Sequence, residues 1–168
     1  MGHQKYIDFA LAQGAKNAVH VTIEQIAFDS RAYLKCVFGC NGGNPDTLCP
    51  SQPGRIMPWE YETILKRYSW GILIHSNSNH IAQQISLDLE KKAFLDGYYF
   101  AFSLNYCSLC DNCNRFDGKS CVRYSDVRPS MEGVGIDVFK TIRGIGLPIE
   151  VLKEKDEEEN RYALVLVE

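Results

Sequence analysis

The sequence predicts an α/β fold in a single domain over residues 1–168, with an α+β arrangement as the alternative. We expect a mixed β-sheet of about five strands, helices packed on that sheet, and two cysteine-rich cluster-binding loops. Three observations lead to this prediction. Segments with helical spacing alternate with β-branched segments, 168 residues suit one ordinary domain, and no internal repeat or linker interrupts the chain.

The first half of the chain alternates between helix and strand. Residues 5–13 carry apolar side chains at helical spacing and predict a short amphipathic helix. Residues 18–23 are rich in β-branched side chains and predict a strand, in which His20 is more often a packed residue than a ligand. Pro58 suits the first turn of a helix, and residues 70–75 (WGILIH) predict a buried strand.

The middle of the chain predicts a longer helix and then an aromatic strand. The helix is expected to end near Leu95, with an inward stripe formed by Ile81, Ile85 and Leu89. Residues 98–106 (YYFAFSLNY) follow as the most aromatic segment of the chain. This predicted strand leads directly into Cys107.

The last part of the chain predicts one helix and two strands. Ser130 is a suitable N-cap for a helix over residues 131–143. Residues 147–152 and 162–167 are apolar enough for strands. The charged run between them, residues 153–161, predicts a solvated hairpin loop.

Composition and charge exclude several classes of protein. The net charge of -3 and the pI of about 5.8 argue against nonspecific nucleic-acid binding, which requires a basic surface. The apolar runs are too short to cross a bilayer, and the first residues lack the pattern of a secretion signal. We therefore expect a cytoplasmic protein with no nucleic-acid or membrane partner, and its oligomeric state stays open.

Seven cysteines form two groups and are the strongest chemical signal in the sequence. In a reducing compartment thiols stay reduced unless a metal uses them, and an odd number cannot pair completely in disulfides. Metal ligation is therefore the favoured interpretation. The candidate ligands are Cys36, Cys40 and Cys49 in the first group and Cys107, Cys110, Cys113 and Cys121 in the second.

The spacing of the second group favours an iron–sulfur cluster. A C-x2-C-x2-C segment with a more distant fourth cysteine can wrap a [4Fe-4S] cluster, with one thiolate on each iron. The first group supplies only three thiolates, so two such clusters would leave one iron without a cysteine. His20, a carboxylate, water or a small molecule could complete that position, and the last two would make it a substrate site.

Zinc is the competing metal. Structural zinc sites usually combine two separated C-x2-C pairs, whereas here three cysteines share one short segment and the other group is a triplet. This arrangement disfavours zinc without excluding it. Arg123 and Arg128 flank the end of the second group, where a guanidinium would stabilise a negatively charged cluster; the alternative is an ordinary surface or capping role.

Several stretches of the chain together carry a family resemblance. They are residues 35–40 (KCVFGC) with Cys49-Pro50, residues 90–104 (EKKAFLDGYYFAFSL), residues 107–113 (CSLCDNC) with Cys121, residues 128–141 (RPSMEGVGIDVFKT) and residues 146–152 (GLPIEVL). In order and spacing these stretches resemble the cysteine-rich "predicted metal-binding proteins" of bacteria and archaea, many of them anaerobes (domain of unknown function 2284). The resemblance spans most of the chain.

The resemblance implies a metal-binding or iron–sulfur protein whose reaction is not established. It implies that the seven cysteines are ligands, and it marks Arg128 and Glu132 as candidate cofactor-binding residues that support those ligands. The first hypothesis is therefore a protein with two [4Fe-4S] clusters that serves electron transfer, with a redox partner protein, or an accessory redox step. The alternatives are an enzyme with an open iron at the three-cysteine cluster and a zinc-stabilised interaction module.

Overall fold

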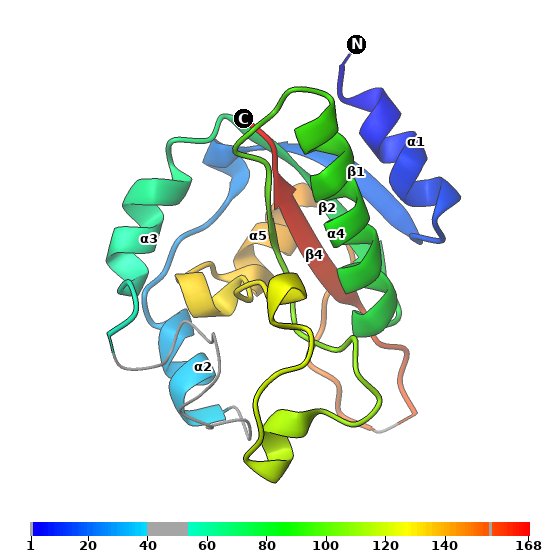
Figure 1. Ribbon diagram of the computed structural model, residues 1–168. Helices are drawn as coiled ribbons and strands as arrows, with labels where there is room; N and C mark the ends of the chain where they lie inside the picture. The colour runs from blue at the N-terminus through cyan, green and yellow to red at the C-terminus, as the bar shows by residue number, and fades with distance from the viewer. Residues whose placement is uncertain (1, 40–53, 155) are drawn as a thin grey trace.

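The computed structural model describes residues 2–39, 54–154 and 156–168 (Figure 1). In these ranges the chain forms helices, strands and short 3-10 turns. The helices are α1 (Gln4–Ala12), α2 (Ala32–Gly39), α3 (Pro58–Leu65), α4 (Asn79–Leu95) and α5 (Val138–Ile145). The strands are β1 (Asn17–Thr22), β2 (Trp70–Ser76), β3 (Phe102–Leu104) and β4 (Arg161–Leu166), and the 3-10 turns are η1 (Ile23–Gln25), η2 (Asn114–Asp117), η3 (Tyr124–Asp126) and η4 (Glu132–Val134).

The strands form one sheet in the order β1-β2-β4-β3. The predicted fold class, helices packed on a β-sheet, is confirmed. In the described residues the sheet has four strands where about five were expected, and each neighbouring pair is antiparallel, so the sheet is not mixed. The register of the central pair sets Ile72 opposite Val165 and Ile74 opposite Ala163.

Helices cover both faces of the sheet. Helices α1 and α4 lie on one face, and α3, α5 and η4 contribute to the core on the other (Figure 1). The side chains of β2 alternate between these two cores: Ile72 and Ile74 point to the first, and Leu73 points to the second. Every residue of β2 is buried, as predicted for this segment.

Gly71 allows the two central strands to approach each other. A Cβ atom at this position would lie 2.6 Å from the carbonyl oxygen of Val165 in β4. The backbone of a central strand cannot move away from such a contact without breaking its ladder. Only glycine therefore fits at residue 71.

The predicted helix over residues 131–143 is wrong as a continuous element. The chain forms η4, turns at Gly135 with a φ of 86°, and only then begins α5. The N-cap residue of η4 is Met131 and not Ser130 as predicted, although the Ser130 hydroxyl accepts a hydrogen bond from the Gly133 amide at 3.1 Å. Asp137 caps α5 through the Lys140 amide at 2.9 Å.

The predicted strand over residues 147–152 is also wrong. Both edges of β4 are already paired, with β2 and with β3, so this segment has no adjacent edge to join. It runs alongside instead, with Ile149 buried in the core and the Pro148 carbonyl accepting a hydrogen bond from the Tyr162 hydroxyl. The charged run after it is consequently not the loop of a β-hairpin.

Three smaller expectations change as well. The aromatic strand shortens to β3, because residues 98–101 form a turn closed by a hydrogen bond from the Ala101 amide to the Tyr98 carbonyl. Ile81 is exposed, and the buried stripe of α4 starts at Ala82. Cys36 lies on helix α2 and not in a loop. Among the described residues no helix has both the length and the apolar character needed to cross a membrane.

Candidate metal centre

The second cysteine group lies between β3 and η3, on a segment that is irregular apart from the 3-10 turn η2. We call residues 107–121 the cysteine loop; it occupies the lower end of the molecule in Figure 1. Cys107 is exposed, whereas Cys110, Cys113 and Cys121 are partly buried free thiols. The structure thus brings all four candidate ligands of this group onto one short stretch at the surface.

Hydrogen bonds hold the two ends of this segment together. The amide of Asn105, just before the loop, donates to the carbonyl of Pro129, just after it, at 2.9 Å. The side-chain amide of Asn105 donates to the Ser86 hydroxyl of α4 at 3.0 Å. We call this closed base, residues 103–105 and 128–129 with their partners on α4, the neck of the loop.

A largely buried ion pair reinforces the neck. Arg128 forms a two-pronged contact with Glu90 of α4, with Nε–Oε2 at 3.0 Å and Nη2–Oε1 at 2.6 Å. Glu90 also accepts hydrogen bonds from the amide and the hydroxyl of Ser103, both at 2.6 Å. Burial raises the pKa of Glu90, but the hydrogen bonds from Arg128 and Ser103 outweigh it and leave that pKa below its ordinary value.

Nearly all of the hydrogen-bond donors of the Arg128 side chain are used in the neck. Its Nη1 donates to the carbonyls of Ser125 and Val127, both at 2.9 Å, in addition to the two bonds with Glu90. Four of its five N–H groups therefore position the chain at the end of the cysteine loop. Its predicted effect on a bound cluster stays a prediction.

Helix α4 also holds the beginning of the loop. The Ser108 amide donates to the side-chain carbonyl of Gln83 at 2.5 Å, and His80 donates from Nδ1 to the Ser108 carbonyl at 3.0 Å. Leu109, between Cys107 and Cys110, is buried. The first turn of the C-x2-C-x2-C segment is therefore anchored, while the residues after it extend from the body of the protein.

Arg123 links the two arms of the cysteine loop. Its Nη1 donates to the Leu109 carbonyl at 3.4 Å, and its Nε is paired with Asp126 at 2.9 Å. This contact carries a positive charge from the arm after Cys121 to the residue next to Cys110. A guanidinium in this position suits negatively charged ligands.

The ligands are not assembled around one point. Among the described residues no three His, Cys, Asp or Glu side chains lie close enough to hold one ion. The chemistry of the donor set nevertheless fits an iron–sulfur cluster or another soft metal, since four thiols share fifteen residues. Thiolates that repel one another gather only when a cation binds them, so assembly of such a site is coupled to metal binding.

The first cysteine group begins at the same end of the molecule. Cys36 lies on α2, which packs against η4, the turn that bears Glu132 (Figure 1). The chain leading into α2 is tied to the same region by an isolated bridge between Phe28 and Ile136 and a hydrogen bond from the Asp29 amide to the Gly135 carbonyl at 2.8 Å. The predictions for Cys40 and Cys49 lie outside the described residues.

His20 lies far from the cysteine loop. It is on β1, at the edge of the sheet opposite β3. Its ring lies 4.1 Å from that of His3 and 5.7 Å from that of Trp70, measured between centroids. Burial and the neighbouring His3 lower the pKa of His20. These contacts are those of a packed residue, which is the more common role of a histidine in a strand.

The neck contains residues that sequence reasoning missed. Gln83, Ser86 and Glu90 all point from α4 to the loop. Their spacing of i, i+3 and i+7 puts them on one helical face, and Gln83 and Ser86 are fully buried. In the sequence they could have been recognised as polar residues at the spacing that is usual for the buried apolar residues of a helix.

Comparison with known proteins identifies a family. The family model described as "predicted metal-binding protein (DUF2284)" covers residues 19–167. No curated protein and no solved structure matches the chain. Because the family model spans both cysteine groups, the neck and η4, the chain belongs to the DUF2284 family of predicted metal-binding proteins.

Proposed function

We propose that this protein binds a [4Fe-4S] cluster through Cys107, Cys110, Cys113 and Cys121. The observation that carries the proposal is the construction of the cysteine loop: a neck fixed by buried hydrogen bonds supports a thiol-bearing segment with little apolar content of its own. Such a segment gains its structure from a bound group more readily than from packing. The match to a predicted metal-binding family supports the coarser part of the proposal, that the protein binds a metal.

A second cluster is proposed for Cys36, Cys40 and Cys49. Helix α2 holds Cys36 at the end of the molecule where the cysteine loop lies, which favours two centres near each other. Clusters held close together exchange electrons readily, so electron transfer with a redox partner protein, or an accessory redox step, is the role we propose. Arg123 would offset part of the negative charge of the first cluster.

The proposal is tested by removing one thiol. The variant Cys110→Ser is expected to lose about four iron and four sulfide per chain, together with the matching share of visible absorption, after anaerobic purification. The matched control is Asn112→Ser, which alters the same segment and keeps all seven thiols. Its iron content should equal that of the unchanged protein.

Two results would count against the proposal. Unchanged iron and absorption in Cys110→Ser would show that this cysteine is not a ligand. A colourless protein that carries stoichiometric zinc and no sulfide would support the zinc-stabilised module instead.

A further inference from the structure

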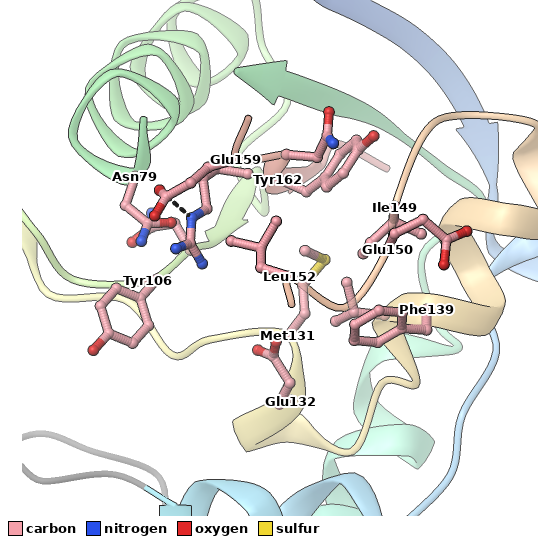
Figure 2. Close-up of a pocket in the computed structure, with 14 residues that line it drawn as sticks. Asn79, Tyr106, Met131, Glu132, Phe139, Ile149, Glu150, Leu152, Glu159 and Tyr162 are labelled. Atoms are coloured by element: carbon pink, nitrogen blue, oxygen red, sulfur yellow. Dashed lines mark hydrogen bonds and ion pairs between the residues drawn. The ribbon is translucent and has the colours of Figure 1, made fainter. Parts of the chain in front are cut away.

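A cavity lies directly beside the start of the cysteine loop. Its volume is about 360 Å³, enough for a small organic molecule (Figure 2). It is lined by residues from α4, η4, α5, the segment 149–152 and β4, and by Asn105 and Tyr106, which precede Cys107. None of the lining residues is a cysteine.

One side of the cavity is apolar. Met131, Val138 and Ile149 form a buried floor, and each is less than 10 % exposed. Phe139 and Leu152 form part of the rim and are both 38 % exposed (Figure 2). A buried apolar floor with an exposed apolar rim is suited to the hydrocarbon part of a ligand.

One lining residue, Asn105, carries a buried acceptor without a partner among the described residues. Asn105 is 2 % exposed, and its Oδ1 has no hydrogen-bond partner among the described residues. The orientation of this amide follows from Ser86, whose hydroxyl proton is donated to the Gln83 carbonyl at 2.8 Å and which therefore accepts from Asn105 Nδ2. An unpaired buried oxygen is costly, and the Nε2 of Gln83 is a buried donor of the same neck that also lacks a partner among the described residues.

Four charged side chains complete the lining, namely three carboxylates and one guanidinium. Glu132, labelled in Figure 2, forms no hydrogen bond or ion pair with another described side chain, whereas Glu150 and Glu159 are paired with Arg143 and Arg161. Arg161 contacts Glu159 through Nε at 2.9 Å, and in the described part of the chain its Nη groups have no such partner. The pKa of Arg161 is raised chiefly by its hydrogen bond with Glu159, and Glu132, Tyr106 and Arg161 line the same cavity.

We propose that this cavity binds an α-amino acid with an apolar side chain. The carboxylate of the ligand pairs with the Nη groups of Arg161, its ammonium group is held by Glu132, and its side chain lies on Met131 and Ile149. The proposal matches one unpaired carboxylate, one guanidinium and an apolar floor to a single small zwitterion. It does not depend on the proposed metal chemistry.

The test compares ligands that differ in one charge. L-phenylalanine, phenethylamine and 3-phenylpropanoate share a side chain, and L-leucine serves as a second, smaller zwitterion. Binding to the full-length, anaerobically purified protein is measured by isothermal titration calorimetry. At least one of the two amino acids should bind at least about tenfold more tightly than both single-charge analogues, since each lacks one ion pair.

Two variants assign the two ends of the ligand. Glu132→Gln should weaken L-phenylalanine about tenfold and leave 3-phenylpropanoate unchanged, and Arg161→Met should weaken L-phenylalanine similarly and leave phenethylamine unchanged. If only L-leucine binds, the same variants are titrated with L-leucine, 4-methylpentanoate and isopentylamine. Glu154→Gln, an exposed glutamate outside the lining, is the control and should change nothing.

The outcomes separate this inference from the metal proposal. Absence of saturable binding by both amino acids overturns the inference, as does equal affinity for a zwitterion and either of its single-charge analogues. Selective loss in the two variants supports it whether or not iron is present. Iron content is measured on the same samples. It tests the proposed cluster and has no bearing on whether the cavity binds an amino acid.

Discussion

The neck of the cysteine loop and its tip, residues 110–121, are built from opposite kinds of contact. At the neck, Asn105 and Ser103 are buried, and Arg128 and Glu90 are largely so; all four make hydrogen bonds to one another or to α4. At the tip, none of the described side chains is fully buried, and the ion pair between Asp117 and Lys119 is exposed. The protein therefore fixes where the loop begins and ends and leaves its interior to be organised by its thiols.

This difference explains why the ends of the cysteine loop are held in place while its cysteines are not gathered around one point. Buried polar groups that satisfy one another give a unique arrangement, and their loss is costly. Exposed polar groups add little to stability and do not select one conformation. A metal centre at the tip would supply the organising contact that packing does not.

Breaking the ion pair of the neck should have the largest effect on stability. Glu90→Gln leaves Arg128 partly buried without its charge partner, and we expect the free energy of unfolding to fall by about 3 kcal/mol. The matched control is Glu62→Gln on α3, whose pair with Lys66 is more exposed and worth less than about 0.5 kcal/mol. The two variants are compared by urea unfolding in reducing buffer. Equal losses of unfolding free energy would contradict the contrast between the neck and the surface.

The same pair should make stability depend on pH. The folded pKa of Glu90 lies below its ordinary value, so its contribution is complete above about pH 5.5 and is lost as the pH falls through the lower, folded pKa. The difference in unfolding free energy between the unchanged protein and Glu90→Gln should therefore shrink between pH 6 and about pH 3.5. A difference that stays constant over this range would show that Glu90 is not held as a carboxylate.

A smaller loss is expected from Ser86→Ala. This change removes the acceptor of Asn105 Nδ2 and leaves a buried donor unpaired, which costs about 1–2 kcal/mol. Hydrogen exchange should also show faster exchange of the Asn105 amide, which closes the neck through Pro129. Unaltered protection of that amide would mean that the neck does not need the contact with α4.

The smallest effect belongs to the tip. Asp117→Asn removes an exposed pair with Lys119 at 3.9 Å and should change the unfolding free energy by less than about 0.5 kcal/mol. Circular dichroism during thermal unfolding measures this change in unfolding free energy. A loss as large as that of Glu90→Gln would show that the tip is structured by its own side chains.

Local periodicity was sufficient for the elements that form the cores. Helices α1, α3 and α4 and strands β1, β2 and β4 were predicted because their apolar spacing reflects burial directly. Residues 147–152 have the same apolar character but no sheet edge to join, and that depends on which strands flank β4. Strand order is not encoded in the spacing of a single segment.

The sequence was sufficient to identify the thiols of the candidate site but not the residues of the neck that hold the loop. The spacing of the cysteines is a local feature, whereas the neck joins Glu90 to Arg128 and Asn105 to Pro129 across intervals of the chain that only folding closes. The helix that carries Cys36 was missed for a similar reason, since α2 packs on η4, nearly a hundred residues later. Whether Arg128 and Glu132 act on a bound centre stays a prediction.

The most direct test of the account is the metal and sulfide content of the anaerobically purified, full-length protein. Two [4Fe-4S] clusters predict about eight iron and eight acid-labile sulfide per chain, with broad visible absorption that bleaches on reduction. Less than one iron per chain after reconstitution with iron and sulfide, or zinc without sulfide, would contradict it.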